Sequence, residues 1–179
     1  MNEPNAAARS LAPRRLTPEA FAPFGDVIAA RGDSESINQG TSQKFSDLAQ
    51  VELDQGDRAS LHLYRATATP LPTELRLLER HPLGSQAFVP LDRTRFLVVV
   101  AEIPDGGESR PTAGTLRAFV TDGRQGIQLR RGVWHHPLLS LEAGEYLIVD
   151  RWCETPRESE RNLELLPIDP WRVEVSEPA

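Results

Sequence analysis

The sequence predicts a single all-β domain, a sandwich or jelly-roll barrel preceded by one short helix. Three observations lead to this fold class. Short runs of β-forming residues recur along the chain, Gly, Pro and Asp separate these runs, and helical periodicity is scarce. The 12 glycines and 15 prolines are spread along the chain instead of forming a linker, and 179 residues suit one domain. Many short strands with little helix are typical of sandwiches and jelly rolls.

The predicted helix begins at Thr17. Threonine caps helix N-termini, Pro18 suits the first helical position, and the charge of Glu19 favours the positive end of the helix dipole. Pro23 and Gly25 follow closely, so the helix is expected to last one or two turns.

The predicted strands follow this helix. Alternation is clearest between residues 59 and 66, where Leu61 and Leu63 fall on one face while His62 and Tyr64 fall on the other. The strands are expected at Ala59–Ala66, Leu75–His81, Ser85–Leu91, Arg95–Ala101, Leu116–Thr121, Ile127–Arg130, Tyr146–Trp152 and Asn162–Leu166, with turns at Asp105–Gly107 and Asp122–Gly123.

Composition excludes several function classes. Lys and Arg total 20 against 26 Asp and Glu, a net charge of −6, which argues against nucleic acid as a partner. The single cysteine, Cys153, excludes an intrachain disulfide and a multi-cysteine metal site, and it favours a reducing, cytoplasmic location. No apolar run is long enough to predict a membrane partner or a secretion signal. We expect residues 1–15 to be a flexible tail and residues 16–179 to be the domain.

The stretch from Glu79 to Phe88 is the first candidate site. Glu79 and His81 are two residues apart and therefore share one face of a strand. A turn around Pro82-Leu83-Gly84 would bring Gln86 back beside them. A carboxylate, an imidazole and an amide facing one cavity can hold a metal or a small polar ligand, although an exposed strand edge with solvated side chains explains the same pattern.

The second candidate site contains adjacent histidines, His135 and His136, between Trp134 and Pro137. Side chains alternate across a strand, so only one of the two histidines can face a given cavity. A structural and a catalytic role are both open for that histidine. The polar loop around Asn38 and the pair Asp150-Arg151 are weaker candidates, and nothing beside Cys153 would activate its thiol.

Several of these stretches together resemble the ureidoglycolate lyase family. The segments that carry the resemblance are Glu79-Arg80-His81-Pro82-Leu83-Gly84-Ser85-Gln86-Ala87-Phe88, Leu116-Arg117-Ala118-Phe119, Gly132-Val133-Trp134-His135-His136-Pro137-Leu138, Ile37-Asn38-Gln39-Gly40, Asp47-Leu48-Ala49 and Asp150-Arg151. They occur in order between about Leu16 and Leu166. Ser46 and Leu163 depart from the family pattern, which has a histidine and a cysteine there.

The resemblance implies a cupin-like double-stranded β-helix that cleaves ureidoglycolate to glyoxylate and urea during allantoin and purine degradation. It places Glu79, His81, Gln86 and His135 at the four cupin ligand positions, so these are the expected catalytic residues. Glu79, His81 and His135 would also bind any metal, and only weakly. No essential cofactor is expected, and Ni²⁺ or another divalent metal is expected to act as a stimulant.

The small-molecule substrate implied by the resemblance carries a carboxylate, which needs a fixed cation or donor. Arg80, Lys44 and Arg151, together with Asn38, are the candidates for substrate binding, and the sequence does not rank them. Proton transfer is expected from His135 or His81 with Glu79 as partner, whereas His62 is expected to be dispensable. The alternatives are a non-catalytic cupin that binds a small acid and a metal-dependent cupin oxygenase or isomerase.

The resemblance also implies a homodimer. The sequence adds only weak support for a dimer through the aromatic residues Trp152 and Trp171, because aromatic side chains are enriched in interfaces.

Overall fold

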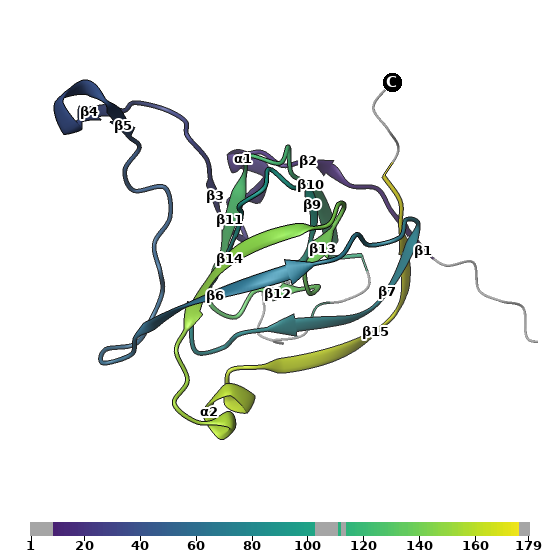
Figure 1. Cartoon of the computed structure of the whole chain (residues 1–179). Coiled ribbons are helices and arrows are strands. Elements are labelled where there is room, and N and C mark those ends of the chain that lie inside the picture. The colour runs from purple at the N-terminus through teal and green to yellow at the C-terminus, as the bar shows by residue number, and fades with distance from the viewer. Residues whose placement is uncertain (1–8, 103–110, 112–113, 176–179) are drawn as a thin grey trace, which may run out of the picture.

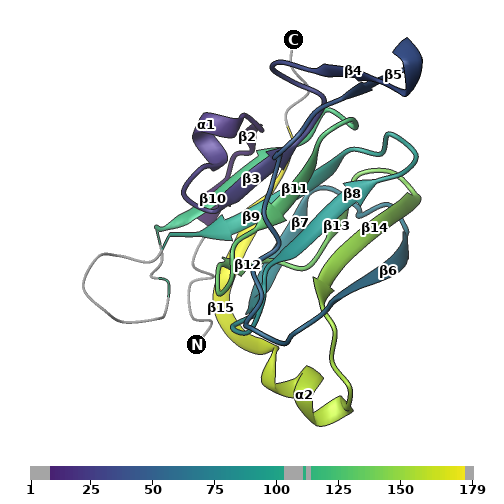
Figure 2. The same ribbon diagram turned by 90° about the vertical axis from the view of Figure 1, so that its left-hand side faces the viewer.

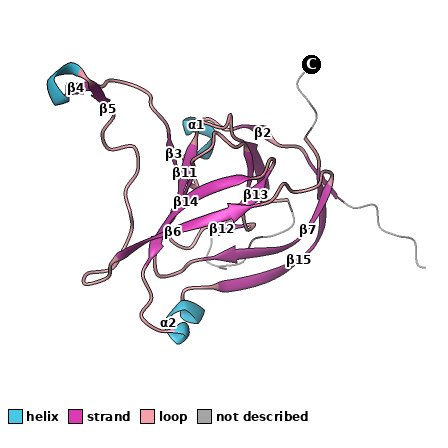
Figure 3. Ribbon diagram, viewed as in Figure 1, coloured by secondary structure: helices cyan, strands magenta, loops and turns pink. Residues whose placement is uncertain are grey.

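The computed structural model describes residues 9–102, 111 and 114–175 of the chain. Strands dominate this part of the molecule (Figure 3), which confirms the all-β prediction. The turn predicted at residues 105–107 lies outside the described residues. No helix among the described residues is long and apolar enough to cross a membrane.

A curled sheet of eight strands forms one wall of the fold. Its order is β1-β15-β7-β12-β9-β10-β2, and β13 also pairs with β9. The strands are β1 (Arg9–Leu11), β2 (Arg14–Arg15), β7 (Thr73–Arg80), β9 (Phe96–Ala101), β10 (Leu116–Val120), β12 (Trp134–His135), β13 (Leu139–Ser140) and β15 (Glu164–Val173).

A five-stranded sheet faces it, in the order β3-β11-β8-β14-β6, so that β6 is an edge strand beside the space between the sheets (Figure 1). A separate hairpin pairs β4 with β5. These strands are β3 (Gly25–Ile28), β8 (Gln86–Pro90), β11 (Gly126–Leu129), β14 (Gly144–Arg151), β6 (Ala59–Ala66), β4 (Glu35–Ile37) and β5 (Ser42–Lys44).

The core explains why the apolar run of β9 is buried throughout. Phe96, Val98 and Val100 belong to the cluster that the two sheets share. The intervening residues, Leu97 and Val99, belong to a second cluster within the curled sheet. Because side chains alternate along a strand, only a strand covered on both faces can bury six consecutive residues.

The N-terminal prediction needs a correction. Residues 9–15 are not a detached tail, because β1 pairs in parallel with β15 and β2 pairs in parallel with β10. The helix prediction is confirmed: α1 (Pro18–Phe21) is capped by Thr17, whose side-chain oxygen accepts a hydrogen bond from the Ala20 amide at 3.2 Å.

A second helix, α2 (Pro156–Arg161), was not predicted. It begins with the same signal as α1, a threonine followed by proline, and the Thr155 side chain accepts a hydrogen bond from the Glu158 amide. The sequence analysis instead expected a strand from Asn162, where the last strand in fact starts at Glu164.

The β4–β5 hairpin, together with the 3-10 turn Asn38–Gly40 at its tip, stands away from the two sheets in both ribbon views (Figures 1 and 2). We call the segment from Glu35 to Lys44 the arm. The chain returns from the arm to the body around Leu53, which forms an isolated bridge with Gly84.

Candidate active site

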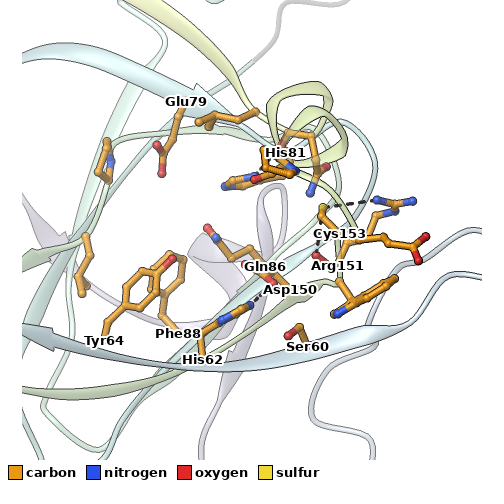
Figure 4. A pocket seen from close by; sticks show the side chains of 18 of the residues that line it. Ser60, His62, Tyr64, Glu79, His81, Gln86, Phe88, Asp150, Arg151 and Cys153 are labelled. Atoms are coloured by element: carbon orange, nitrogen blue, oxygen red, sulfur yellow. Dashed lines mark hydrogen bonds and ion pairs between the residues drawn. The ribbon is translucent and has the colours of Figure 1, made fainter.

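A cavity of about 700 Å³ opens between the edge strand β6 and strand β7. Side chains from β6, β7, β8, β14 and the α2 region line it, and Figure 4 shows them converging from opposite walls. The lining residues that matter below are Ser60, His62, Tyr64, Glu79, His81, Gln86, Asp150, Arg151, Cys153, Glu154, Asn162 and Leu163.

Three predicted site residues meet on one wall. Glu79, near the end of β7, and His81, just after it, share one face by strand alternation, and β12 places His135 directly opposite Glu79 in the antiparallel register. One donor atom from each of Glu79, His81 and His135 lies within 4.8 Å of the others. Neither His135 nor His136 is among the residues that line the cavity, and His135 joins the site through its contact with Glu79.

The hydrogen bonds of the two imidazoles fix the direction of their lone pairs. His81 Nδ1 lies 2.8 Å from the carbonyl oxygen of Asn162, and His135 Nδ1 lies 2.9 Å from that of Val133. A carbonyl oxygen can only accept, so Nδ1 carries the proton in both rings. Each Nε2 is buried without a hydrogen-bond partner among the described residues, and that of His81 faces the cavity.

Glu79 Oε1 lies 3.4 Å from His135 Nε2, a contact that is long for a hydrogen bond. A carboxylate and a neutral imidazole nitrogen with its lone pair would repel each other at this distance, so the geometry calls for a proton or a cation between them. Burial opposes ionisation of Glu79, but the neighbouring His135 and His81 outweigh it and hold its pKa below the usual value.

His81 is prepared to accept a proton. Burial, together with the nearby His135, lowers the pKa of His81, and its hydrogen bond to Asn162 opposes this only in part. The ring is therefore neutral at neutral pH, with Nε2 available as a base.

The turn predicted before Gln86 brings that side chain into the cavity. Gly84 packs so closely that a Cβ there would lie 2.9 Å from the Cβ of Arg151, which explains the need for glycine. Gln86 is buried, and its Oε1 has no hydrogen-bond partner among the described residues. Its amide therefore faces the cavity with unused hydrogen-bonding capacity.

The opposite wall carries His62, which was expected to be dispensable, and Asp150, which was a weaker candidate. His62 Nε2 lies 3.2 Å from Asp150 Oδ1 of the neighbouring strand, and Tyr64 lines the same wall (Figure 4). Burial and the charges of Asp150 and Glu79 raise the pKa of Tyr64. Alternation grouped His62 with Tyr64 but did not show which face of the strand is inward.

The four predicted substrate-binding residues are dispersed. Arg151 lines the cavity, but its guanidinium holds Asp57 through two hydrogen bonds of 2.6 and 2.9 Å. Arg80 projects to the other face of β7, where it pairs with Glu164 and stacks on Trp134. Asn38 and Lys44 lie on the arm, outside the cavity lining.

Of the two departures from the family pattern, Leu163 lines the cavity, whereas Ser46 is exposed just beyond the arm. No role follows for either residue from its position alone.

A model of the ureidoglycolate lyase family matches residues 8–174 of this chain. The chain belongs to the ureidoglycolate lyase family. A ureidoglycolate lyase of Pseudomonas fluorescens is 51% identical over 146 residues, covering 80% of this chain and 85% of that protein. The ureidoglycolate lyase of Pseudomonas syringae pv. syringae is 48% identical over 172 residues, covering 93% of this chain and 99% of that protein.

Among solved structures, RmlC from Streptococcus suis in complex with dTDP-D-xylose matches with a TM-score of 0.43 and 16% identity, over 86% of this chain and 76% of that chain. The predicted function of the chain as a ureidoglycolate lyase, and hence as an enzyme, is confirmed by the family match and the curated relatives.

The ureidoglycolate lyase resemblance implied a divalent metal as a stimulant, and the residues present fit such an ion. Two imidazole nitrogens and one carboxylate are donors that suit nickel or zinc. The unpartnered Nε2 atoms of His81 and His135 point to a missing cation or proton donor. The carbonyls of Asn162 and Val133 orient the rings from behind, as is usual at metal sites in proteins.

Proposed function

We propose that this ureidoglycolate lyase cleaves its substrate to glyoxylate and urea in the cavity between β6 and β7, with Glu79, His81, Gln86 and His135 as the reacting set. The observation that carries the proposal is the convergence of a carboxylate and two outward-facing imidazole nitrogens within 4.8 Å, in a chain of this family.

The reaction moves one proton off the substrate and one onto it. The reacting carbon bears a hydroxyl, a urea nitrogen and a carboxylate. Loss of the hydroxyl proton lets that oxygen form a carbonyl as the C–N bond breaks. The bonding pair then passes to the urea nitrogen, which takes up a proton. The products are glyoxylate and urea, and no oxidant or water is consumed.

The two imidazoles suit the two proton transfers. His81 Nε2 accepts the hydroxyl proton, because its Nδ1–H is held by Asn162 and burial keeps the ring neutral. His135 Nε2, which lies 3.4 Å from the Glu79 carboxylate, is the group that would pass a proton to the departing nitrogen. Gln86 offers its amide to the urea group, which matches it in donors and acceptors.

A divalent ion held by Glu79, His81 and His135 would act as a Lewis acid that polarises the substrate oxygens. Ligation uses the same Nε2 atoms as proton transfer. The two roles are therefore alternatives for each histidine, and chelation experiments separate them.

The wider setting also remains a proposal. The substrate chemistry places the enzyme late in allantoin and purine degradation, where ureidoglycolate is consumed. A homodimer is expected. The cytoplasm is the predicted compartment, because the chain has a single cysteine and so no intrachain disulfide.

The test incubates purified protein with racemic ureidoglycolate and measures glyoxylate and urea in the same samples. We expect the two products in equal amounts, at a rate far above that of a buffer control, with half of the racemate consumed if one enantiomer is preferred. Release of ammonia in place of urea would show hydrolysis of the amide and would contradict the proposed C–N cleavage.

A further inference from the structure

The arm has no bonded partner in its own chain outside its immediate neighbourhood. Every hydrogen bond and ion pair described for residues 34–44 joins two residues of that segment: Ser34 to Gln43, Asn38 to Ser42 and Thr41, and Lys44 to Glu35. At the tip, Asn38 and Gln39 hold φ angles of 51° and 58°, in a region that residues other than glycine rarely adopt. An isolated two-stranded hairpin is at best marginally stable in water. The arm would therefore be stabilised by packing against a surface outside its own chain.

The cavity, for its part, lacks an available cation. Among the described residues that line it, Arg151 is the one arginine or lysine, and its guanidinium is already paired with Asp57. Glu79, Asp150 and Glu154 contribute carboxylates to the same lining. A substrate that carries a carboxylate would meet a net negative wall here, and its binding needs a positive group that the described lining does not provide.

Lys44 is such a group. It is the only lysine of the chain and ends the arm, with 54% of its side chain exposed. Its one described ion pair, to Glu35, is 4.0 Å long and solvent-exposed, so little free energy holds the ammonium there. In the ribbon views the arm and α2, which borders the cavity, lie at opposite ends of the molecule (Figures 1 and 2), so Lys44 does not reach the cavity of its own chain.

We infer that two copies of this chain exchange arms, and that Lys44 of one copy enters the cavity of the other and binds the substrate carboxylate. The inference rests on the proposed function for the identity of the substrate. Glu35 and Lys44 are the charged residues of the arm, so the arm has no net charge, but the Lys44 ammonium at its end is complementary to the carboxylates of the cavity, which makes a second copy the occupant. In a two-fold dimer the exchange is reciprocal, so each copy completes the other's site.

The surface beside the cavity suits this contact. Strand β6 forms one wall of the cavity with its inner face, and its free edge pairs with no described strand. On its outer face Leu61 is 70% exposed and Leu63 is 57% exposed. An edge strand with exposed leucines is a typical site of association, so this surface is where we place the second copy.

Complementation between two inactive variants tests the exchange. Lys44→Ala removes the arm cation and is expected to lower kcat/KM by about 10- to 100-fold, whereas Lys44→Arg retains activity. Glu79→Gln inactivates the cavity but keeps the arm. Co-expressed with different tags, the pair should recover about one quarter of the wild-type activity, because half of the dimers are mixed and each mixed dimer has one complete site. No recovery above the two single variants would overturn the exchange.

A reciprocal mixture makes the same test in the opposite direction. The double variant Lys44→Ala/Glu79→Gln is mixed with the wild-type chain. If the arm acts on its own cavity, all wild-type subunits stay active and about half of the sites work. If the arm is exchanged, only wild-type dimers work, about one quarter of the sites. A value of one half would overturn the inference.

Cross-linking tests the arm position without measuring activity. The chain has one lysine, Lys44, and one cysteine, Cys153, which lines the cavity. A short amine-to-thiol reagent should therefore join unmodified wild-type chains into covalent dimers, with the Lys44–Cys153 linkage identified by mass spectrometry. Lys44→Arg and Cys153→Ser are the controls and should abolish that linkage.

The two kinds of test separate the two claims. Cross-linked dimers from a protein that does not cleave ureidoglycolate would support the arm exchange and contradict the proposed function. An active protein that stays monomeric in light scattering, or that forms no Lys44–Cys153 linkage between chains, would keep the proposed function and overturn the exchange.

Discussion

Replacing Glu79 by glutamine tests the charge at the centre of the site with little change in shape. The Glu79 carboxylate lies 3.4 Å from His135 Nε2, and 18% of its side chain is exposed. With an effective dielectric constant of about 20, a carboxylate and an imidazolium at that distance attract each other by roughly 5 kcal/mol. Solvent access reduces the effect, and removal of the charge should lower the pKa of His81, which Glu79 raises.

Four measurements follow from this charge loss. Turnover should fall by about 10²- to 10⁴-fold, because the reacting set loses the carboxylate that lies beside His135. The acidic limb of the residual pH–rate profile should move to lower pH. Nickel should bind more weakly in calorimetry, since one anionic ligand of the three is gone. The unfolding midpoint should change little, because the glutamine amide can donate to His135 Nε2.

The matched control is Glu164→Gln, which makes the same substitution on the neighbouring strand β15, where Glu164 pairs with Arg80 away from the cavity. That variant should keep wild-type kcat and KM. If Glu79→Gln retained turnover within about threefold of the wild type, no proton transfer or ligation could depend on this carboxylate. The roles assigned to His135 and Glu79 would then be wrong.

Further outcomes are expected from the same site. Dialysis against a chelator should leave much of the activity and added nickel should raise it; a complete loss that metal reverses would assign the three converging side chains to ligation. His62→Ala should raise KM by about 10-fold with a smaller effect on kcat, because it leaves Asp150 unpaired beside an anionic substrate; an unchanged KM would exclude this. Burial lowers the pKa values of His81 and His136, so the unfolded state binds more protons below pH ~6.5. Stability measured by urea unfolding in chelator should therefore fall as the pH drops from 7.5 towards 5, and a flat or rising profile would contradict the neutral imidazoles.

The fold was predictable where the pattern is local. The apolar run of β9 and the alternation of β7 each identify a strand without reference to the rest of the chain, and the structure has both. The short strands β1, β2, β12 and β13 were missed, because two or three residues contain at most one and a half periods of alternation. These segments are strands only because a long neighbour offers them hydrogen bonds.

The site was predictable only in part, for a related reason. Glu79, His81 and Gln86 lie on one strand–turn–strand unit, so their spacing placed them together. His62 was expected to be dispensable, and alternation could not correct this, because it defines two faces of β6 without showing which one is inward. In the structure Leu61 is 70% exposed and His62 lines the cavity. A sheet edge that borders a polar cavity reverses the usual relation between hydrophobicity and burial.

The position of the arm was also beyond local patterns. Lys44 and Asn38 were grouped with the substrate-binding residues, and no local pattern could have shown that they lie outside the lining of the cavity that contains Glu79. A single chain leaves three features unexplained together: exposed leucines on the outer face of β6, a cavity whose one lining arginine is already paired, and a hairpin bonded only to itself. The exposed leucines and the hairpin cost free energy in an isolated monomer, and the described cavity lining offers an anionic substrate no free cation. One arrangement, the exchange of arms between two copies, accounts for all three features, because it covers the leucines, supplies the cation and gives the hairpin a surface to pack against.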